Sequence, residues 1–312
     1  MKRILVLGSL NIDLVQRVPR LPLRGETIQG EDLQIFVGGK GANQACAAAL
    51  LGGRVQMAGK VGDDVFAARL LNELRNAGVD TSLVGTAPGA SGSAAILVLP
   101  NGDNSIVISP AANAQVSIEF ALQAVQNLRE GDLLLCQLET PLDTVASVVQ
   151  AAYAKGVTTV LDPAPARALS DNVLQAVSIL TPNQTEAAIL TGQQETPVDK
   201  AAAEKVARKL QSRGARTVIV KLGDQGCLIV DGETVTAIPA FPVEARDTTA
   251  AGDTFNGGLA AALAEGLGLE AAARIANAAA ALSVTKPGAI SSIQTRSEVY
   301  AFVKAQIAGH EL

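Results

Sequence analysis

Short apolar runs alternate with longer amphipathic stretches along most of the chain. The runs predict strands at 4–8, 54–59, 132–137, 157–162, 177–181 and 216–221. The stretches between them predict helices at 64–77, 117–128, 142–155, 184–191 and 198–213, with further helices from about Gly252, Glu270 and Arg296. This alternation is typical of a parallel sheet with helices on both faces, so we expect a three-layer α/β/α fold with a mostly parallel central sheet.

Two sections, at about 14–37 and 93–110, depart from this rhythm. Both consist of short extended pieces broken by Pro or Gly, and the second contains the hairpin signal Asn101-Gly102-Asp103. We expect them to form a small sheet that stands off the main domain, as a lid over the crevice or a partner surface. Residues 227–231 and 234–238 predict a second hairpin, at the edge of the main sheet.

Composition limits the protein class. The 312 residues, 48% of them hydrophobic and 18% charged, are enough for a large core, and we expect one domain spanning 1–312. The net charge of −5 and the lack of a basic block argue against nucleic acid as a partner. The apolar run that opens the chain ends at Asn11, too early for a signal peptide or a membrane span.

The cysteines and the single histidine narrow the chemistry. Cys46, Cys136 and Cys227 are far apart and lie in apolar runs, which predicts buried thiols in a reducing compartment, and hence a cytoplasmic protein. His310 lies two residues from the C-terminus, where chains are often frayed. Any general base is therefore expected to be a carboxylate.

The stretch from Asp247 to Gly258 carries the clearest chemical signal. Small residues from Thr248 to Gly252 lead into an alanine-rich segment, which predicts a glycine-hinged loop opening a helix. Free N–H groups at such a helix start bind anions such as phosphate. Asp253 would lie beside that phosphate, where a carboxylate makes sense if it removes a proton from an attacking hydroxyl. The alternative is that Asp253 is a helix cap and Gly252 a turn residue.

Two further polar groups stand at predicted strand or helix ends. Asn11 and Asp13 follow the first strand, where side chains point into the ligand crevice of an open α/β sheet, although a plain turn would look the same. The run 38–44 places glycines, Lys40 and Asn43 at a helix start, as a ligand loop or a generic glycine turn. It lacks the Walker A spacing, and no G-x-G-x-x-G follows the first strand, which argues against a dehydrogenase.

Several motifs together resemble those of the ribokinase-like, or PfkB, carbohydrate kinases over essentially the whole chain. They are GSLNIDL at 8–14, GGKGANQA at 38–45, QLETP at 137–141, DPAPAR at 162–167, TPNQTEA at 181–187, KLGDQG at 221–226 and DTTAAGDTFNGG at 247–258. The resemblance implies an ATP-dependent kinase for the primary hydroxyl of a sugar, with D-ribose the expected substrate and D-ribose 5-phosphate the product. It also implies a homodimer formed through the lid.

The resemblance assigns roles to individual residues. It implies that Asp253 is the base and that backbone N–H groups of Ala250, Ala251, Gly252 and Asp253 form the anion hole. The implied sugar ligands are Asn11, Asp13, Gly39, Lys40, Asn43, Glu139 and Asp253. For Glu139 the alternative is a solvated loop residue.

The implied nucleotide contacts form a second set. They are Asn183, Lys221, Leu222, Gly223, Asp224, Gln225, Gly226, Gly252 and Asn277. Lys221 departs from the threonine expected there. Glu186 of the N-x-x-E motif is expected to place Mg²⁺ through water, while Asn183 is alternatively, or in addition, a helix cap.

A monovalent cation site, expected to take K⁺, is implied beside the anion hole. Its matching positions are Asp247, Thr249, Ser283, Lys286, Gly288 and Ser292. Pro287 is a local departure from the family pattern. The rival hypotheses are a family kinase for 2-deoxyribose, fructose, a nucleoside or a keto-deoxy sugar acid, and a sugar-binding homologue without turnover.

Overall fold

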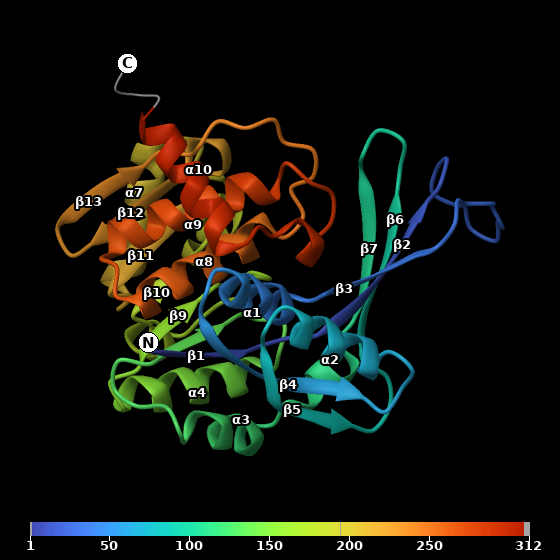
Figure 1. Cartoon of the computed structure of the whole chain (residues 1–312), viewed down its shortest axis with the longest axis horizontal. Coiled ribbons are helices and arrows are strands. Elements are labelled where there is room, and N and C mark those ends of the chain that lie inside the picture. The colour runs from blue at the N-terminus through green and yellow to red at the C-terminus, as the bar shows by residue number, and fades with distance from the viewer. Residues whose placement is uncertain (1, 194, 309–312) are drawn as a thin grey trace.

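A large sheet covered by helices on both faces forms the body of the molecule, and a small sheet projects from it (Figure 1). The structure is a computed structural model that describes residues 2–193 and 195–308. His310 therefore lies outside the described residues.

The large sheet has nine strands in the order β13-β12-β11-β10-β9-β8-β1-β4-β5. Their bounds are β1 Arg3–Leu7, β4 Arg54–Gly62, β5 Asp80–Ala87, β8 Leu133–Cys136, β9 Thr158–Leu161, β10 Ile179–Leu180, β11 Thr217–Lys221, β12 Cys227–Asp231 and β13 Thr234–Ile238. All neighbours from β11 to β5 are parallel, and β12 and β13 form an antiparallel hairpin at the edge. The predicted mostly parallel sheet and edge hairpin are confirmed.

Two hydrophobic cores lie on opposite faces of this sheet. One packs under α1 Lys40–Leu50, α2 Ala67–Asn76, α8 Ala251–Glu265, α9 Leu269–Ser283 and α10 Arg296–Ala308. The other packs under α3 Ile118–Val125, α4 Leu142–Ala154, α5 Asp171–Gln175, α6 Gln184–Thr191 and α7 Lys200–Ser212. In β1, Ile4 and Val6 join the first core while Leu5 and Leu7 join the second, as expected of a strand buried on both faces.

Two elements escaped prediction from the sequence. Strand β5 has the sequence DTSLVGTA, in which polar residues interrupt the apolar pattern because the strand lies at the sheet edge and is partly exposed. Helix α5 has five residues, too few to show a helical period. Strand β5 and helix α5 add to the predicted elements and do not change the predicted order of the other strands and helices.

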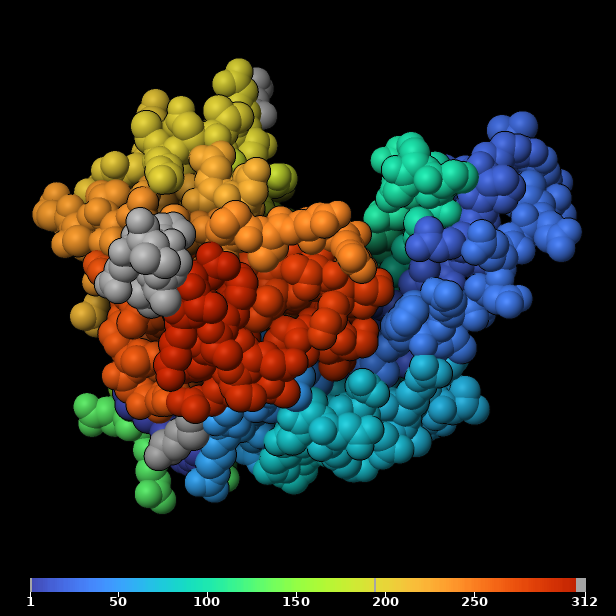
Figure 2. Space-filling model, turned by 45° about the horizontal axis from the view of Figure 1, so that its top comes forward, coloured from blue at the N-terminus to red at the C-terminus, as the bar shows by residue number. Residues whose placement is uncertain are grey.

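The small sheet, hereafter the lid, has four strands in the order β3-β2-β6-β7. They are β2 Asn11–Arg17, β3 Gln34–Gly38, β6 Gly92–Val98 and β7 Asn104–Ser109. The first lid strand begins at Asn11, so Asn11 and Asp13 lie within a strand that pairs with β3 and β6, not in a plain turn. Figure 2 shows the lid standing apart from the body, with a hollow between them.

Small residues let α1 and α8 approach closely. A Cβ atom on Gly257 of α8 would lie 2.5 Å from Ala47 Cβ and 2.7 Å from the Gln44 carbonyl oxygen, both on α1. On the next residue, Gly258, a Cβ atom would meet its nearest neighbour, Leu51 Cδ1, at 3.2 Å. The close helix pairing therefore depends on Gly257 more than on Gly258.

We predict that Gly257→Ala destabilises the fold, because the added methyl group meets backbone of a packed helix. Overpacking typically costs about 1–3 kcal/mol, partly offset by the ~1 kcal/mol by which Ala exceeds Gly in helix propensity. Denaturant unfolding followed by circular dichroism measures the change. Gly258→Ala is the matched control, and equal stabilities for the two variants would contradict this packing argument.

Candidate active site

Two adjoining cavities lie at the carboxyl edge of the parallel strands, where open α/β sheets bind ligands. One, of about 500 Å³, is polar and is lined by residues that include Lys40, Asp162, Glu186 and Asp253. The other, of about 470 Å³, is mainly apolar. Their lining residues overlap at Lys221, Gly223, Thr248, Ala251 and Gly252. The two cavities thus meet at the start of α8.

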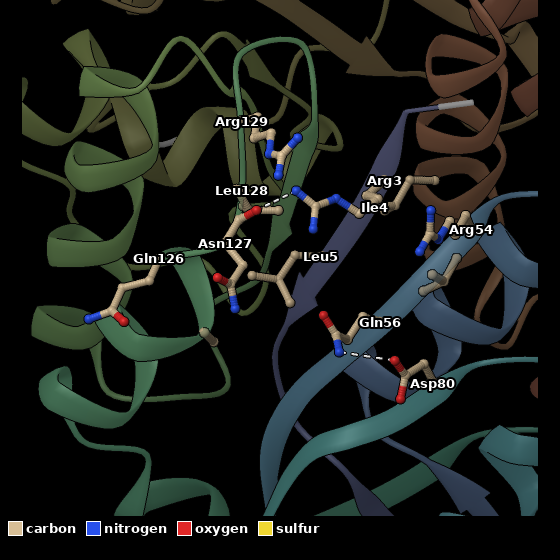
Figure 3. Close-up of a pocket in the computed structure, with 12 residues that line it drawn as sticks. Arg3, Ile4, Leu5, Arg54, Gln56, Asp80, Gln126, Asn127, Leu128 and Arg129 are labelled. Atoms are coloured by element: carbon tan, nitrogen blue, oxygen red, sulfur yellow. Dashed lines mark hydrogen bonds between the residues drawn. The ribbon is translucent and has the colours of Figure 1, made fainter.

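Another hollow, of about 540 Å³, lies at the opposite edge of the sheet, where β1 and β4 begin (Figure 3). Its rim includes Arg3, Arg54 and Arg129. Arg3 pairs with Asp132 at 2.7 Å, which ties β1 to the segment before β8. No predicted site residue lines this hollow.

Asp253 lies in the first turn of α8 and is 5% exposed. Its two carboxylate oxygens accept hydrogen bonds from α1: Asn43 Nδ2 at 2.9 Å and Gln44 Nε2 at 2.9 Å. Burial raises the pKa of Asp253, and the Lys40 ammonium and these two amides oppose the shift. The carboxylate is therefore held in a fixed orientation at the wall of the polar cavity.

The predicted anion hole is an open helix start. Ala250, the residue before α8, has φ 57° and ψ 16°, a left-handed conformation that only a few per cent of non-glycine residues adopt. Among the described residues the N–H groups of Ala250, Gly252 and Asp253 have no acceptor, while Ala251 N–H donates to the Thr248 carbonyl at 3.3 Å. Three of the four predicted donors are thus available to an anion.

The predicted sugar ligands converge from the lid, α1 and the segment after β8. Glu139 accepts hydrogen bonds from Lys40 N–H at 3.0 Å and from the Ser9 hydroxyl. Asn113 Nδ2 donates to Asn11 Oδ1 at 2.7 Å. At Gly39, with φ 89°, a Cβ atom would lie 2.8 Å from Asn11 N, so the loop needs glycine there.

The sugar-side groups are electrostatically coupled. Burial, together with the carboxylates of Glu139 and Asp253, raises the pKa of Asp13 to about 6. The Asp253 carboxylate is the main cause of the raised pKa of the Lys40 ammonium, which burial opposes. Asn43 Oδ1 is buried without a hydrogen-bond partner in the described part of the chain. An acceptor left in this way is suited to a hydroxyl of a bound ligand.

The predicted nucleotide residues divide between the cavities. Asn183 and Glu186 line the polar cavity, Asp224, Gly226 and Asn277 line the apolar one, and Lys221, Gly223 and Gly252 line both. The Leu222 side chain is buried in the core under α7, and Gln225 Nε2 donates to the Val198 carbonyl. Neither of these last two side chains lines a cavity.

The sequence analysis did not predict the apolar residues that line the second cavity. They include Phe241, Pro242 and Val243, from the segment after β13, and Val284, after α9. Asn277 Nδ2 donates to the carbonyls of Ile238 and Pro239, both at 3.2 Å, and so fixes the start of that segment. A Phe-Pro-Val run in a loop carries no motif, so its signal in the sequence is weak.

Glu186 and Asn183 form a capping box at the start of α6. Asn183 Oδ1 accepts from Glu186 N–H at 2.8 Å, and Glu186 accepts from Asn183 N–H at 2.7 Å and from Asn183 Nδ2 at 2.9 Å. The capping alternative for Asn183 thus describes its contacts in this structure. Burial raises the pKa of Glu186, and Lys221 opposes the shift.

Asp247 joins two loops near the start of α8. Its Oδ1 accepts from Thr249 N–H at 2.9 Å and from Thr249 Oγ1 at 2.6 Å, and its Oδ2 accepts from Gly288 N–H at 2.8 Å. Burial opposes ionisation, but these bonds lower the pKa of Asp247.

The other predicted cation-site side chains have protein partners. The hydroxyls of Ser283 and Ser292 donate to the carbonyls of Ala280 and Ala289, and Lys286 Nζ donates to Gln294 Oε1. No group of three or more His, Cys, Asp or Glu in residues 2–193 and 195–308 is arranged to hold a metal ion.

Asp162 and Gln44 are site residues that sequence reasoning missed. Gln44 Nε2 donates to Asp162 Oδ2 at 2.8 Å as well as to Asp253, and Lys221 Nζ donates to Asp162 Oδ1 at 2.9 Å. Asp162 is the first residue of the DPAPAR motif, and Gln44 is the last residue of the glycine-rich run 38–44. Both residues therefore belong to motifs that could have marked them as candidate site residues.

Comparisons with known proteins agree with this geometry. The model of the "pfkB family carbohydrate kinase" family matches residues 1–296. A ribokinase of Haemophilus influenzae is 43% identical over 97% of this chain and 99% of its own length. A deoxyribokinase of Salmonella typhi is 38% identical over 93% of this chain and 94% of its own.

A solved structure gives the same result for the fold. The Arabidopsis thaliana ribokinase complexed with ribose and ATP superposes with a TM-score of 0.89 at 33% identity, over 97% of this chain and 99% of that one. The fold, the order of the motifs and these matches over nearly the whole length lead to one assignment. The chain belongs to the pfkB family of carbohydrate kinases.

Proposed function

We propose that this protein is an ATP-dependent kinase that transfers phosphate to the primary hydroxyl of D-ribose and gives D-ribose 5-phosphate. The observation that carries the proposal is the placement of Asp253: a buried carboxylate, oriented by two amides, beside the open N-terminus of α8. The support for ribose comes from the ribokinases similar to this chain, one of them solved with ribose and ATP.

The residues divide the work of phosphoryl transfer. Asp253 takes the proton of the attacking hydroxyl, and the N–H groups at the start of α8 stabilise charge on the transferring phosphate. Asn11, Asp13, Asn43 and Glu139, with Lys40 and Gly39 beside them, hold the sugar hydroxyls. A pocket built from such polar groups rejects a ligand that leaves them unpaired.

The two cavities suit the two ends of ATP. The polar cavity, at the helix start, takes the phosphates, while the apolar cavity with Phe241 and Val243 takes the base. Closure of the lid would exclude water, which otherwise competes with the sugar for the phosphate. Because ATP is the phosphate donor, a cytoplasmic location is part of the proposal.

Mg²⁺ and K⁺ belong to the proposal as cofactors. Glu186 is suited to contact Mg²⁺ through water, since both its oxygens already accept hydrogen bonds and it lines the polar cavity. Mg²⁺ would neutralise phosphate charge. The loops joined by Asp247 would hold K⁺, largely through backbone carbonyls, with Thr249, Ser283, Lys286, Gly288 and Ser292 as the surrounding positions.

The rival substrates are 2-deoxyribose, fructose and nucleosides. Among these rivals, 2-deoxyribose is supported by the similarity of this chain to a deoxyribokinase. A sugar acid would need a cationic clamp, and among the proposed sugar ligands Lys40 alone is cationic. A sugar-binding homologue without turnover is disfavoured, because Asp253, Gly252 and Glu186 are all in place.

We predict that Asp253→Asn lowers turnover by about 10²–10⁴-fold, the usual contribution of a general base. The amide keeps the shape of the side chain, so ribose affinity should stay within a few-fold of the original. Steady-state kinetics and calorimetry of ribose binding measure the two effects. A variant with near-normal turnover would refute the role of Asp253.

Ribose binding should weaken as the pH falls through about 6. Asp13 has a pKa raised to about 6, so below that pH it is protonated and loses acceptor sites for sugar hydroxyls. Calorimetry of ribose binding between pH 5 and 8 measures this. Asp13→Asn is the control: this variant should bind ribose more weakly at pH 8, and its ribose affinity should no longer change near pH 6. If the variant kept the same pH dependence, a group other than Asp13 would be responsible for it.

The lid should form a homodimer interface, because it exposes several large apolar side chains, among them Phe36, Ile106, Val107 and Ile108. We predict a dimer at micromolar concentration by light scattering. Val107→Glu should yield monomers, since Val107 is 72% exposed on β7. Val65→Glu, at a position 86% exposed outside the lid, should stay dimeric. A monomeric unmodified protein would contradict the prediction.

A further inference from the structure

The hollow at the amino edge of the large sheet is lined by three arginines (Figure 3). Arg3 lies at the start of β1, Arg54 at the start of β4, and Arg129 in the segment before β8. These three strands are neighbours in the sheet. The proposed active site lies at the carboxyl edge of the same strands, so the hollow is a separate feature. In a chain with a net charge of −5, such a concentration of positive charge needs an explanation.

The strand register places two of the like charges side by side. Arg3 and Arg54 are partners in the parallel pairing of β1 with β4, so their side chains leave the same face of the sheet. Like charges directly opposite each other on adjacent strands are destabilising. The Arg54 side chain makes no hydrogen bond or ion pair within the described residues. A bound anion between the strands would remove this repulsion.

Asp80, on β5, supplies the carboxylate of the lining, and its oxygens are already in use. Its Oδ1 accepts from Ser82 N–H at 2.8 Å, and its Oδ2 accepts from Gln56 Nε2 at 3.0 Å. The hydrogen bonds from Ser82 are the main cause of the lowered pKa of Asp80, and Arg54 contributes through its charge. Asp80 therefore stays ionised but forms no ion pair with Arg54 in the described part of the chain.

The guanidinium of Arg3 is fixed by its neighbours and still has donors to offer. Its Nε and Nη2 donate to Asp132 Oδ2 at 3.1 Å and 2.7 Å, and Nη2 also donates to the Asn127 carbonyl. Its Nη1 has no acceptor in residues 2–193 and 195–308, and the same is true of the whole guanidinium of Arg129. Even with Asp132 counted against Arg3, the lining keeps an excess of positive charge.

The opposite wall of the hollow follows the carboxyl end of α3, whose free carbonyls would repel an anion. These carbonyls are occupied by cations. Lys155 Nζ donates to the carbonyls of Val125 at 3.1 Å and Leu128 at 3.4 Å. Arg3 takes the carbonyl of Asn127. The helix end therefore does not cancel the attraction of the arginines for an anion.

We propose that this hollow binds a phosphate monoester of a small sugar or polyol. Guanidinium groups bind phosphate oxygens in pairs, so Arg3, Arg54 and Arg129 would hold the phosphate. The volume of about 540 Å³ is typical of small-molecule sites and leaves room for more than a phosphate ion. The side-chain amides of Gln126 and Asn127 also line the hollow, make no hydrogen bond within the described residues, and would bind the hydroxyls.

The test uses D-glucose 6-phosphate as the probe, with inorganic phosphate and D-glucose for comparison. Each is titrated by calorimetry into the unmodified chain and into the double variant Arg54→Gln with Arg129→Gln. Arg3 is left unchanged because it binds Asp132. Melting temperatures report whether each variant is folded.

The matched control is the double variant Arg216→Gln with Arg274→Gln. Both of these arginines are exposed, and neither side chain makes a hydrogen bond or ion pair in the part of the chain that the structure describes. Neither lines this hollow or the two cavities of the proposed active site. The control removes the same net charge, so it separates binding in the hollow from a general attraction of anions.

We expect the unmodified chain to bind glucose 6-phosphate, and the Arg54 and Arg129 double variant to bind it about tenfold or more weakly, as for loss of hydrogen bonds between charged groups. The control variant should stay within about twofold of the unmodified chain. Inorganic phosphate should bind more weakly than the ester, because it lacks the hydroxyls, and glucose should not bind detectably. This pattern would establish the site.

Three results would overturn the proposal. One is that glucose 6-phosphate does not bind to the unmodified chain, or binds equally well to the Arg54 and Arg129 double variant. Another is an equal loss of affinity in the control variant, which would assign the binding to net charge alone. Inorganic phosphate that bound as tightly as the ester would show a site for the free ion and not for a monoester. None of these outcomes depends on the proposed kinase activity.

Discussion

The site depends on a carboxylate that is held where little water reaches it. Asp253 is almost completely buried, and an isolated buried charge is expensive. The structure compensates it with two amide donors from α1, the Lys40 ammonium and the positive end of α8. Lys40 and the residues at the start of α8 also line the polar cavity. The groups that compensate the buried carboxylate are therefore partly the same ones that line the proposed ligand site.

This compensation requires α1 and α8 to lie very close together. Glycine and alanine at the contact, above all Gly257 against Ala47, make that approach possible. The lack of a side chain matters in the ligand loops too, where Gly39 and Gly41 pack directly on the backbone of residues 8–11. Low bulk along these segments thus serves to bring polar groups of distant segments within hydrogen-bonding distance.

Much of the fold follows from local pattern. Strands buried on both faces, such as β1 and β8, stand out as unbroken apolar runs, and the glycine signals marked the lid hairpin and the helix starts. Strand β5 escaped because it lies at an edge and alternates irregularly. The candidate base Asp253 and the candidate residues around it were predicted through motifs.

The hydrogen-bond network around Asp253 was harder to predict than the position of Asp253 at the cavity. Gln44 bonds to Asp162 and Asp253, which are 118 and 209 residues away along the chain. Neither contact leaves a local periodicity. The apolar wall with Phe241 and Val243 belongs to a loop, and its role depends on Asn277 fixing the start of that loop from another helix. Such contacts are set by tertiary packing, which the sequence pattern alone does not specify.

The most direct measurement of the central claim is sugar-dependent ADP release with Mg-ATP. D-Ribose, 2-deoxyribose, fructose and common nucleosides would be compared, each with and without K⁺. We predict the highest turnover with ribose, and a higher turnover with K⁺ than without it. Turnover with a different sugar alone would keep the chemistry but contradict the substrate, and no turnover with any of them would contradict the assignment of Asp253 as a catalytic base.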